Sequence, residues 1–312
     1  MKCPHCRSSN IIRKGQRKTK LDLRQLYFCK NCRKGFIENQ LLYKTYSPKI
    51  IITALSYYNF GYTLEEAAKL TNKKFKVKIS KSSVSQWLKE FKQICTYHKI
   101  RERARKKYGK EILFSKTFRH NGLAYNFKYH QPKLEALCQI NCFHSLIKYI
   151  KNFKNGCPEF FNGIENRCSR TKINVKFEKE SHFNNACRLA DLALKSCQKN
   201  SERHSIIETF MLVNDSSTIA CEIPVWFWEK NLDVGIAGHI DLLQIRSGKI
   251  YILDFKPKDT KEGEQKIASQ LFLYALGLSF RTAIPLKNFV CAWFNEEIYH
   301  EFNPVEVKTK SD

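Results

Sequence analysis

Residues 238–259, GHIDLLQIRSGKIYILDFKPKD, contain two consecutive segments that are apolar on both faces. Both segments are rich in β-branched and aromatic residues, and Ser247-Gly248 between them is a turn signal. They therefore predict the two strands of a β-hairpin. Strands without a polar face are typical of a sheet that is covered on both sides. We therefore expect this hairpin to be buried, which requires a core large enough to enclose it.

Three charged residues interrupt the apolar hairpin: Asp241, Asp254 and Lys256. If the loop has two residues, Arg246 faces Lys249, and the same register sets Asp241 opposite Asp254. Cross-strand neighbours have Cβ atoms about 4.5–5.5 Å apart, so two like charges there destabilise a sheet. Lys256 lies on the same face as Asp254, because side chains alternate along a strand. Two acids and an amine indicate a divalent cation with oxygen ligands, Mg²⁺ or Mn²⁺. The alternative is an edge hairpin whose charges reach solvent.

The composition points to an intracellular protein. The 312 residues include 13 cysteines, but the N-terminus MKCPHC does not have the pattern of a signal peptide. No window approaches 18 consecutive apolar residues, so we expect no membrane partner. Cysteine pairs in a reducing compartment are typically metal ligands rather than disulfides. We therefore expect a cytoplasmic protein, associated with the nucleoid if it binds DNA.

Positive charge is concentrated near the N-terminus. Residues 1–110 contain 28 Lys and Arg residues against 6 Asp and Glu, whereas the rest of the chain contains 27 against 23. Such a basic block neutralises phosphates and releases counterions, which favours salt-sensitive binding to nucleic acid. The alternative is a surface that is merely highly charged and soluble.

Two CxxC pairs open the chain. Cys3 and Cys6 form the first pair, and Cys29 and Cys32 form the second. Each pair can direct two thiolates at one ion, so together they predict a closed structural Zn²⁺ site with four sulfur ligands.

This segment resembles the zinc ribbons of insertion-sequence transposases. The resemblance rests on CPxC, a short basic hairpin with Gly15, and a closing element in which Tyr27 and Phe36 flank the second cysteine pair. It covers about a tenth of the chain. Arg7 departs from the pattern, because a glycine is usual after the second cysteine, and this affects the turn rather than the metal.

Residues 46–94 predict three helices. Ser47-Pro48 is a helix start, Gly61 ends that helix, and Thr63 with Glu66 forms a capping box for the second. A third helix starts near residues 80–82. The set resembles the helix-turn-helix of transposases and recombinases, and a plain three-helix bundle is the alternative. The resemblance implies that the DNA-facing end of the recognition helix contains Lys81, Ser82, Ser83, Ser85 and Gln86.

Residues 99–175 receive no confident assignment. They begin with a basic segment, KIRERARKKYGK, which we interpret as a helix end or linker. Four scattered cysteines follow, at positions 138, 142, 157 and 168. Without a further CxxC pair, we favour buried thiols over a second metal site.

Further motifs surround the hairpin. Upstream, residues 201–215 predict a helix on which His204 and Glu208, four apart, share one face. The strand ACEIPVWFWEK follows. Downstream, EQKIASQLFLYALGL is an amphipathic helix with Gln270 and Tyr274 at i and i+4. Taken alone, a helical histidine is usually structural and a tyrosine usually belongs to the core.

The order of these motifs resembles the PD-(D/E)XK nuclease superfamily and, within it, the RecB-like branch. The resemblance covers roughly residues 180–295. It implies that metal ligands are His204, Asp241 and Asp254, that the catalytic residues are Asp241, Asp254 and Lys256, and that Gln270 and Tyr274 contact nucleic acid. Glu208 is a weaker candidate that supports the ligands. The cysteines that bind an iron–sulfur cluster in some members are not seen, so we expect no cluster.

The sequence thus predicts a multidomain protein of mixed α+β and α/β class. Four segments follow one another along the chain. They are a zinc ribbon (1–40), a helix-turn-helix domain (41–98), a basic linker and unassigned region (99–175) and a nuclease-like domain (176–312). The last is expected to be a restriction-endonuclease-like mixed β-sheet flanked by helices. The leading hypothesis is a Mg²⁺- or Mn²⁺-dependent deoxyribonuclease, targeted by its DNA-binding head and associated with a mobile element. The alternatives are a non-catalytic DNA-binding regulator and, less favoured, an RNA substrate; a homodimer is a further option.

Overall fold

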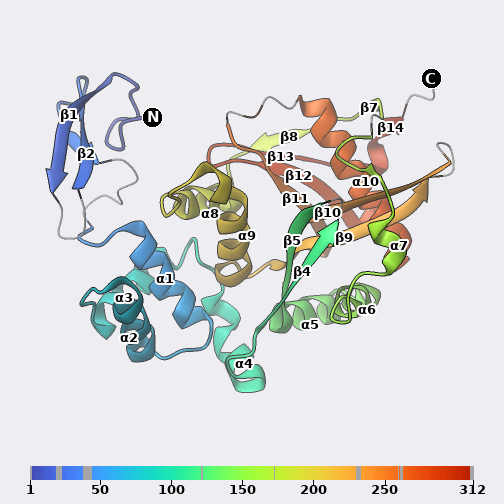
Figure 1. Cartoon of the computed structure of the whole chain (residues 1–312), viewed down its shortest axis with the longest axis horizontal. Helices are drawn as coiled ribbons and strands as arrows, with labels where there is room; N and C mark the ends of the chain where they lie inside the picture. The colour runs from blue at the N-terminus through green and yellow to red at the C-terminus, as the bar shows by residue number, and fades with distance from the viewer. Residues whose placement is uncertain are drawn as a thin grey trace.

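The computed structural model describes residues 2–18, 23–37, 44–120, 122–171, 173–229, 233–258, 260 and 263–309. Within them the chain forms a small N-terminal sheet, a group of helices and a large mixed sheet with helices on both faces (Figure 1). The mixed α/β class predicted from the sequence is confirmed. No helix in this part of the chain has the length and apolar character needed to cross a bilayer.

The N-terminal sheet has the antiparallel order β1 (Ile11–Lys18), β2 (Leu23–Cys29), β3 (Gly35–Ile37). Its buried core consists of Cys3, Tyr27, Cys29 and Phe36, with the Tyr27 and Phe36 rings stacked at 5.8 Å. A core this small needs additional support such as a bound metal.

Three helices follow, α1 (Pro48–Asn59), α2 (Leu64–Phe75) and α3 (Lys81–Phe91). The predicted capping box is present: Thr63 Oγ1 accepts from the Glu66 backbone N–H, and the Glu66 carboxylate accepts from that of Thr63. Ser80 caps α3 by accepting from the Ser83 N–H. These caps satisfy backbone donors that a helix start otherwise leaves unpaired. A fourth helix, α4 (His98–Tyr108), contains the basic segment.

The large sheet contains nine strands among the described residues. Eight of them follow the order β4-β5-β9-β10-β11-β12-β13-β8, and β6 pairs with β10 beside this path. Only the pairs β11–β12 and β6–β10 are parallel in this described sheet. The strands are β4 (Leu113–His120), β5 (Leu123–His130), β6 (Asn166–Arg167), β8 (Glu180–His182), β9 (Thr218–Glu229), β10 (Val234–Arg246), β11 (Lys249–Phe255), β12 (Phe289–Phe294) and β13 (Tyr299–Phe302). β4, β5 and β6 thus bring part of the unassigned region into the sheet. A separate pair joins β7 (Val175–Lys176) to β14 (Lys308–Thr309).

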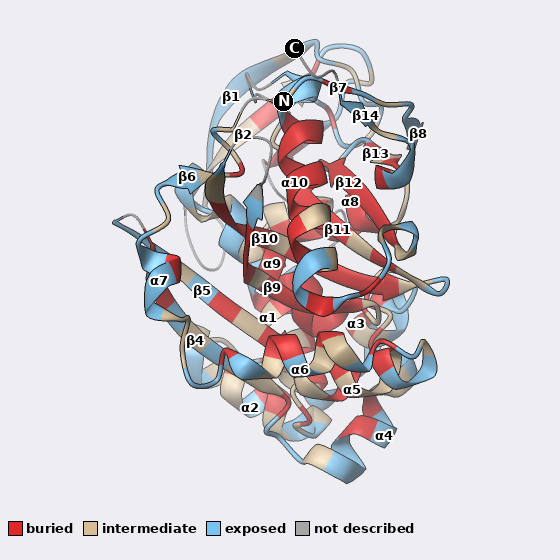
Figure 2. Ribbon diagram, turned by 90° about the vertical axis from the view of Figure 1, so that its right-hand side faces the viewer, coloured by how far each residue is buried: buried red, intermediate tan, exposed pale blue. Residues whose placement is uncertain are grey.

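Helices cover both faces of the sheet. They are α5 (Gln131–Ile140), α6 (His144–Asn152), α7 (Glu159–Asn162), α8 (Asn185–Leu194), α9 (Arg203–Asn214) and α10 (Glu264–Thr282). Ile250 and Ile252 belong to one apolar core together with α5, α6 and α10. Leu253 and Phe255, on the opposite face, belong to a second core with α8, α9 and the helices α1 to α3. Figure 2 shows that α10 is buried along most of its length.

The hairpin has the predicted register. Arg246 pairs with Lys249 and Leu242 with Leu253, with a two-residue loop at Ser247-Gly248. Both loop residues have positive φ, 50° and 73°, as a type I′ turn requires. This prediction from the turn signal and the alternation is confirmed.

The three-helix unit packs against α9. Asn59 of α1 donates a buried hydrogen bond of 2.8 Å to Asn214 Oδ1, at the end of α9. Arg101 of α4 donates to the backbone carbonyls of Tyr58 and Tyr62, at 2.8 and 2.7 Å. A shared apolar core and buried polar contacts therefore join the predicted helix-turn-helix to the large sheet.

Candidate active site and metal centres

Four cysteine thiols converge in the N-terminal sheet, as predicted. The sulfur atoms of Cys3, Cys6, Cys29 and Cys32 all lie within 4.8 Å of one another. The Cys3–Cys32 and Cys6–Cys29 sulfur distances are 3.6 and 3.5 Å. Sulfurs bound to Zn²⁺ at about 2.3 Å form a tetrahedron with edges of about 3.8 Å, so the cluster could hold a zinc ion with little adjustment.

The backbone near the cysteine pairs forms tight turns and affects the pKa of one thiol. Arg7 and Arg33 follow the two pairs, and both have positive φ, 59° and 56°. This conformation favours glycine, which explains why a glycine is usual at the position of Arg7. Arg7 adopts the same conformation, and the four sulfurs still converge. A hydrogen bond from the backbone of Cys32 lowers the pKa of Cys29 to about 7. A thiol with a lowered pKa supplies the thiolate that a metal needs.

The hairpin brings the two predicted aspartates together. The Asp241 and Asp254 carboxyl groups lie close enough for each to shift the pKa of the other. Asp254 is 2 % exposed, and its Oδ2 atom lies 2.9 Å from Lys256 Nζ. That contact is an ion pair without full hydrogen-bond geometry, so Oδ2 is a buried acceptor that lacks a hydrogen-bond donor among the described residues. The predicted triad of Asp241, Asp254 and Lys256 is therefore compact.

Helix α9 supplies the other predicted residues. His204 Nδ1 lies 3.7 Å from Asp241 Oδ2. One ligand atom each from His204, Glu208 and Asp241 lie within 4.8 Å of one another. Glu208 therefore occupies a ligand position in this group, although the sequence had suggested only a supporting role. The group does not include Asp254, which is a neighbour of Asp241.

The acids in this group lack sufficient counter-charge. Burial, then Glu222 and Asp241, raise the pKa of Glu208 well above its usual range. Burial and the Asp241 charge do the same to the pKa of Asp254. For Asp241, burial also acts to raise the pKa, but the interactions with His204 and Asp254 outweigh burial, so the pKa of Asp241 is lowered. Neighbouring carboxyl groups whose pKa values are raised by burial and by one another's charge indicate a place where a cation would be favourable.

Glu222 is a further acid that sequence reasoning did not assign to the site. In the β9–β10 register Ile223 faces Ile240 and Cys221 faces Leu242, so Glu222 falls opposite Asp241. Burial and the Asp241 charge raise its pKa to about 8. Its φ of 53° is strained for a residue with a side chain, and such strain is common at functional sites. Extending the hairpin register to the strand before it would have found this residue.

Lys128 on β5 is a second residue that was missed. Its Nζ donates to Thr209 Oγ1 of α9 at 2.9 Å, and its charge lowers the pKa values of Glu208 and Glu222. No local pattern in the sequence marks it, because its contact with the acids depends on the pairing of β5 with β9.

Helix α10 places its predicted pair beside Asp241. Gln270 Nε2 donates to the Tyr274 hydroxyl at 2.9 Å, and both side chains are buried. Together with Asp241 they line a cavity of about 160 Å³. Gly238 makes this arrangement possible, because a Cβ there would lie 2.5 Å from Tyr274 Cε1. The full lining is Tyr125, Arg167, Ser169, Glu222, Gly238, His239, Asp241, Gln270 and Tyr274.

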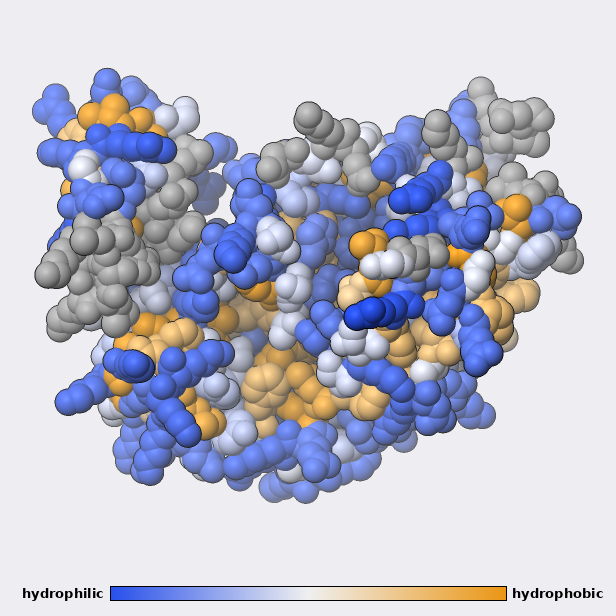
Figure 3. Space-filling model, in the orientation of Figure 1, coloured by the Kyte–Doolittle hydropathy of each residue, from blue (hydrophilic) through white to orange (hydrophobic). Residues whose placement is uncertain are grey.

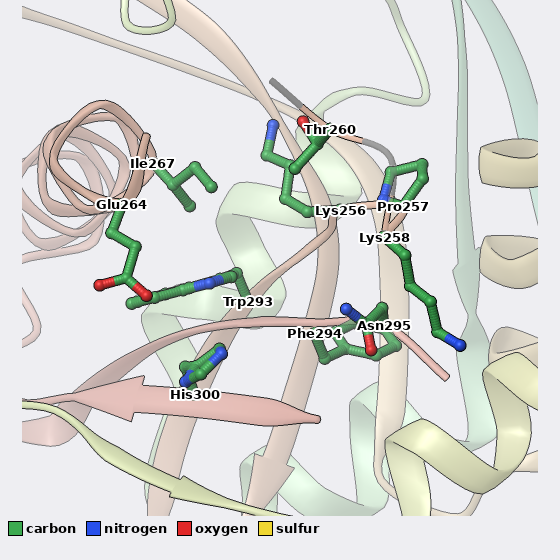
Figure 4. Close-up of a pocket in the computed structure, with 10 residues that line it drawn as sticks. All are labelled: Lys256, Pro257, Lys258, Thr260, Glu264, Ile267, Trp293, Phe294, Asn295 and His300. Carbon is green, nitrogen blue, oxygen red and sulfur yellow. The ribbon is translucent and has the colours of Figure 1, made fainter. Parts of the chain in front are cut away.

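A second cavity, also of about 160 Å³, adjoins Lys256 at the ends of the parallel strands β11 and β12. Figure 4 shows Glu264 and Ile267 entering it from α10, with Trp293 and His300 beside them. Trp293 and His300 stack at 4.9 Å. Lys256 therefore lies between the acidic residues and this second cavity.

The residues predicted to face DNA lie on α3, at a distance in the fold from the acids. Lys81, Ser82 and Gln86 are exposed, and Ser83 and Ser85 are half-buried. Val84, Trp87 and Phe91 on the same helix are buried. Helix α3 therefore has a core side and a surface side, while its role toward DNA stays a prediction.

The four cysteines of the unassigned region do not assemble into a site. Cys138 and Cys168 are buried, Cys157 is half-buried and Cys142 is exposed. None belongs to a potential metal group in the described ranges. The sequence analysis favoured buried thiols, and two of the four cysteines, Cys138 and Cys168, are buried.

Comparison with known proteins gives no assignment. No family model, no curated protein and no solved structure matches this chain. The functional argument therefore rests on the geometry.

Proposed function

We propose that this chain is a divalent-metal-dependent nuclease that hydrolyses phosphodiester bonds in DNA. The observation that carries the proposal is the contact of Asp241 with both His204 and Asp254, beside the buried Lys256–Asp254 ion pair. Carboxylates, an imidazole and an ammonium at the end of a buried hairpin provide the groups that metal-assisted phosphoryl chemistry uses.

The order of elements supports this proposal. The elements follow one another as α9, β9, β10, β11, α10 and β12. Helix α9 contains His204, and the antiparallel strands β9 to β11 contain Asp241 and Asp254. Helix α10 contains Gln270, and β12 is parallel to β11. The elements from α9 to α10 are the succession on which the resemblance to PD-(D/E)XK nucleases was based. The resemblance itself remains part of the proposal.

The donor set fits a hard divalent cation. His204, Glu208 and Asp241 would hold Mg²⁺ or Mn²⁺. Asp254 would add the buried oxygen Oδ2, which lies 2.9 Å from Lys256 Nζ and has no hydrogen-bond donor of full geometry among the described residues. Ligands at about 2.1 Å from Mg²⁺ lie at most about 4.2 Å apart, so the group would contract only slightly. The cation, when bound, supplies Lewis acidity and makes water more acidic.

The protein groups then have separate roles. The Lys256 ammonium, fixed by Asp254, is placed to stabilise negative charge that develops on the scissile phosphate. Asp241 and Glu208 present carboxylates, and the His204 ring orients Asp241 through its 3.7 Å contact. Gln270 and Tyr274 hold each other in the adjoining cavity, where they can contact the strand being cut.

The N-terminal region would bring the site to DNA. We assign DNA binding to the zinc ribbon, which the Cys3, Cys6, Cys29 and Cys32 cluster would stabilise, and to the exposed start of α3. The 28 basic residues of segment 1–110 support this assignment. Figure 3 shows hydrophilic side chains over much of the ribbon and the neighbouring helices.

The test is DNA cleavage by the whole protein. Plasmid and single-stranded DNA are incubated with wild-type protein in Mn²⁺ or in EDTA, alongside Asp254→Ala and the control Asp191→Ala, a half-buried acid on α8 that pairs with Lys195. We expect cleavage in Mn²⁺ that EDTA and Asp254→Ala abolish and that the control retains. Tight, salt-sensitive binding without any cleavage would instead support a DNA-binding regulator, and cleavage by Asp254→Ala at the wild-type rate would refute the site.

A further inference from the structure

The cavity beside Asp241 is lined on one side by residues outside the predicted nuclease-like region. Tyr125 comes from β5, Arg167 from β6 and Ser169 from the turn after β6. The parallel pairing of Arg167 with Ala237 fixes β6 against β10, and the Cys168 N–H donates to the Ala237 carbonyl at 2.9 Å. The unassigned segment therefore contributes a wall to the candidate active site.

Arg167 presents an available cation in this wall. Its guanidinium carbon lies 5.7 Å from the Tyr125 ring centroid, and Tyr125 stacks on His239 at 3.5 Å with the rings parallel. Within the described part of the chain, the guanidinium makes no hydrogen bond or ion pair below 4 Å. A guanidinium has five N–H donors in a planar fork that matches phosphate oxygens. The guanidinium thus lies over the face of the Tyr125 ring, and its donors are left for a ligand.

Two further polar groups line the cavity. His239 is 4 % exposed, and neither ring nitrogen makes a hydrogen bond of full geometry to a described residue, although the Glu222 carbonyl lies nearby. Ser169 adds a hydroxyl. A buried imidazole without a proper partner indicates that the cavity holds a polar ligand or water.

The size of the cavity limits the ligand. A volume of about 160 Å³ holds about five water molecules at about 30 Å³ each. A phosphate group, with one phosphorus and four oxygens, has the right number of atoms to fill it. Arg167 favours an anion over a neutral group, although the acids Asp241 and Glu222 line the same cavity.

We infer that this cavity is a phosphate subsite in which Arg167 binds the phosphate next to the one that is cut. The inference rests on the proposed nuclease function and extends it to the substrate. The bound group is either an internal phosphodiester, as in a continuous strand, or a terminal phosphate at a strand end.

The experiment measures cleavage of short single strands in Mn²⁺ by wild-type protein, Arg167→Ala, Arg167→Lys and the exposed neighbour Arg170→Ala. Each strand is prepared with a 5′-phosphate and with a 5′-hydroxyl. Arg167→Ala is expected to raise KM at least about tenfold, as loss of a charge-assisted hydrogen bond predicts. Arg167→Lys should restore part of this loss, and Arg170→Ala should match wild type. A defect equal on both strands assigns an internal phosphate, and a defect confined to the 5′-phosphorylated strand assigns a terminal one.

Two outcomes overturn the inference. One is an Arg167→Ala protein with wild-type KM on both strands. The other is full recovery of KM when Glu222→Gln is added to Arg167→Ala, because Arg167 would then serve only to balance Glu222.

A measurement of DNA binding distinguishes failure of the proposed nuclease function from failure of the phosphate subsite. If wild-type protein cuts nothing, the affinity of a four-nucleotide strand is measured by fluorescence anisotropy in Mn²⁺. Weaker binding by Arg167→Ala than by Arg170→Ala would support the subsite without catalysis. Equal binding by these two variants would overturn it.

Discussion

His204 Nδ1 on α9 lies 3.7 Å from Asp241 Oδ2 on β10, which links this helix to the acidic residues of the sheet. The far end of the same helix is fixed to α1 by the hydrogen bond between Asn59 and Asn214. One helix therefore contacts both the candidate metal site and the predicted helix-turn-helix.

The first prediction concerns this connection. Asn59→Ala removes a buried hydrogen bond and leaves Asn214 Oδ1 without its donor, so the free energy of unfolding should fall by about 1–3 kcal/mol. The exposed Asn155→Ala is the matched control. Urea titration followed by tryptophan fluorescence measures both. Equal midpoints for the two variants would mean that the contact does not stabilise the fold.

The second prediction separates two neighbouring lysines. Lys256 pairs with the buried Asp254, whereas Lys258 is exposed and pairs with Glu296 and Glu297. Lys256→Ala should lower kcat by roughly 10²–10³-fold, as expected for loss of a group that stabilises transition-state charge. Lys258→Ala should keep a kcat near that of the wild type. Single-turnover cleavage of labelled DNA measures the difference, and similar losses in both variants would contradict the assigned role of Lys256.

The third prediction tests the contact between Gly238 and Tyr274. Gly238→Ala would place a Cβ 2.5 Å from the Tyr274 ring, which is too close for both groups to stay in place. We expect the free energy of unfolding to fall by about 1–3 kcal/mol, the usual effect of overpacking. Gly263→Ala, where a Cβ would meet nothing within 4 Å, is the control. Thermal melts of the two variants that coincide would show that the core adapts without loss.

The fourth prediction is a dependence of stability on pH. Lys133 is fully buried and donates to the Asp215 carbonyl at 2.7 Å, and burial lowers its pKa from 10.5 to about 7. Between these values the unfolded chain binds more protons than the folded one, so this residue makes stability rise with pH from about 7 to 10.5. The rise is up to about 5 kcal/mol, at about 1.4 kcal/mol per pKa unit.

The measurement compares Lys133→Met with the exposed control Lys148→Met. Urea midpoints are recorded from pH 7 to pH 10.5 for both variants and for wild type. The rise attributed to Lys133 should disappear in Lys133→Met and persist in Lys148→Met. Parallel curves for all three proteins would exclude the predicted effect.

Local patterns were sufficient to predict the hairpin, the helix caps and the four-thiol cluster. Ser247-Gly248 and the alternation around it define the register of β10 and β11, because both signals lie within a few residues of the pairing. The capping box at Thr63 and Glu66 is local in the same sense. The two CxxC pairs predict their cluster because each pair places two sulfurs on one turn.

Contacts between distant strands were beyond the reach of such patterns. Arg167 lines the cavity only because a two-residue strand pairs with β10, about seventy residues further along the chain. Lys128 approaches Glu208 and Glu222 because β5 joins the sheet beside β9. Neither residue has a motif of its own, since its role depends on tertiary pairing rather than on its sequence neighbours.

The most direct test of the central claim is the dependence of DNA cleavage on Mn²⁺ concentration. It is measured with metal-free preparations of the wild-type protein, Asp241→Asn and Glu208→Gln. The exposed Glu165→Gln is the control. The account predicts saturable activation for wild type and Glu165→Gln, no activation for Asp241→Asn and a shift to higher Mn²⁺ for Glu208→Gln. A wild-type curve that is flat at all concentrations, or an Asp241→Asn curve that overlays wild type, would contradict it.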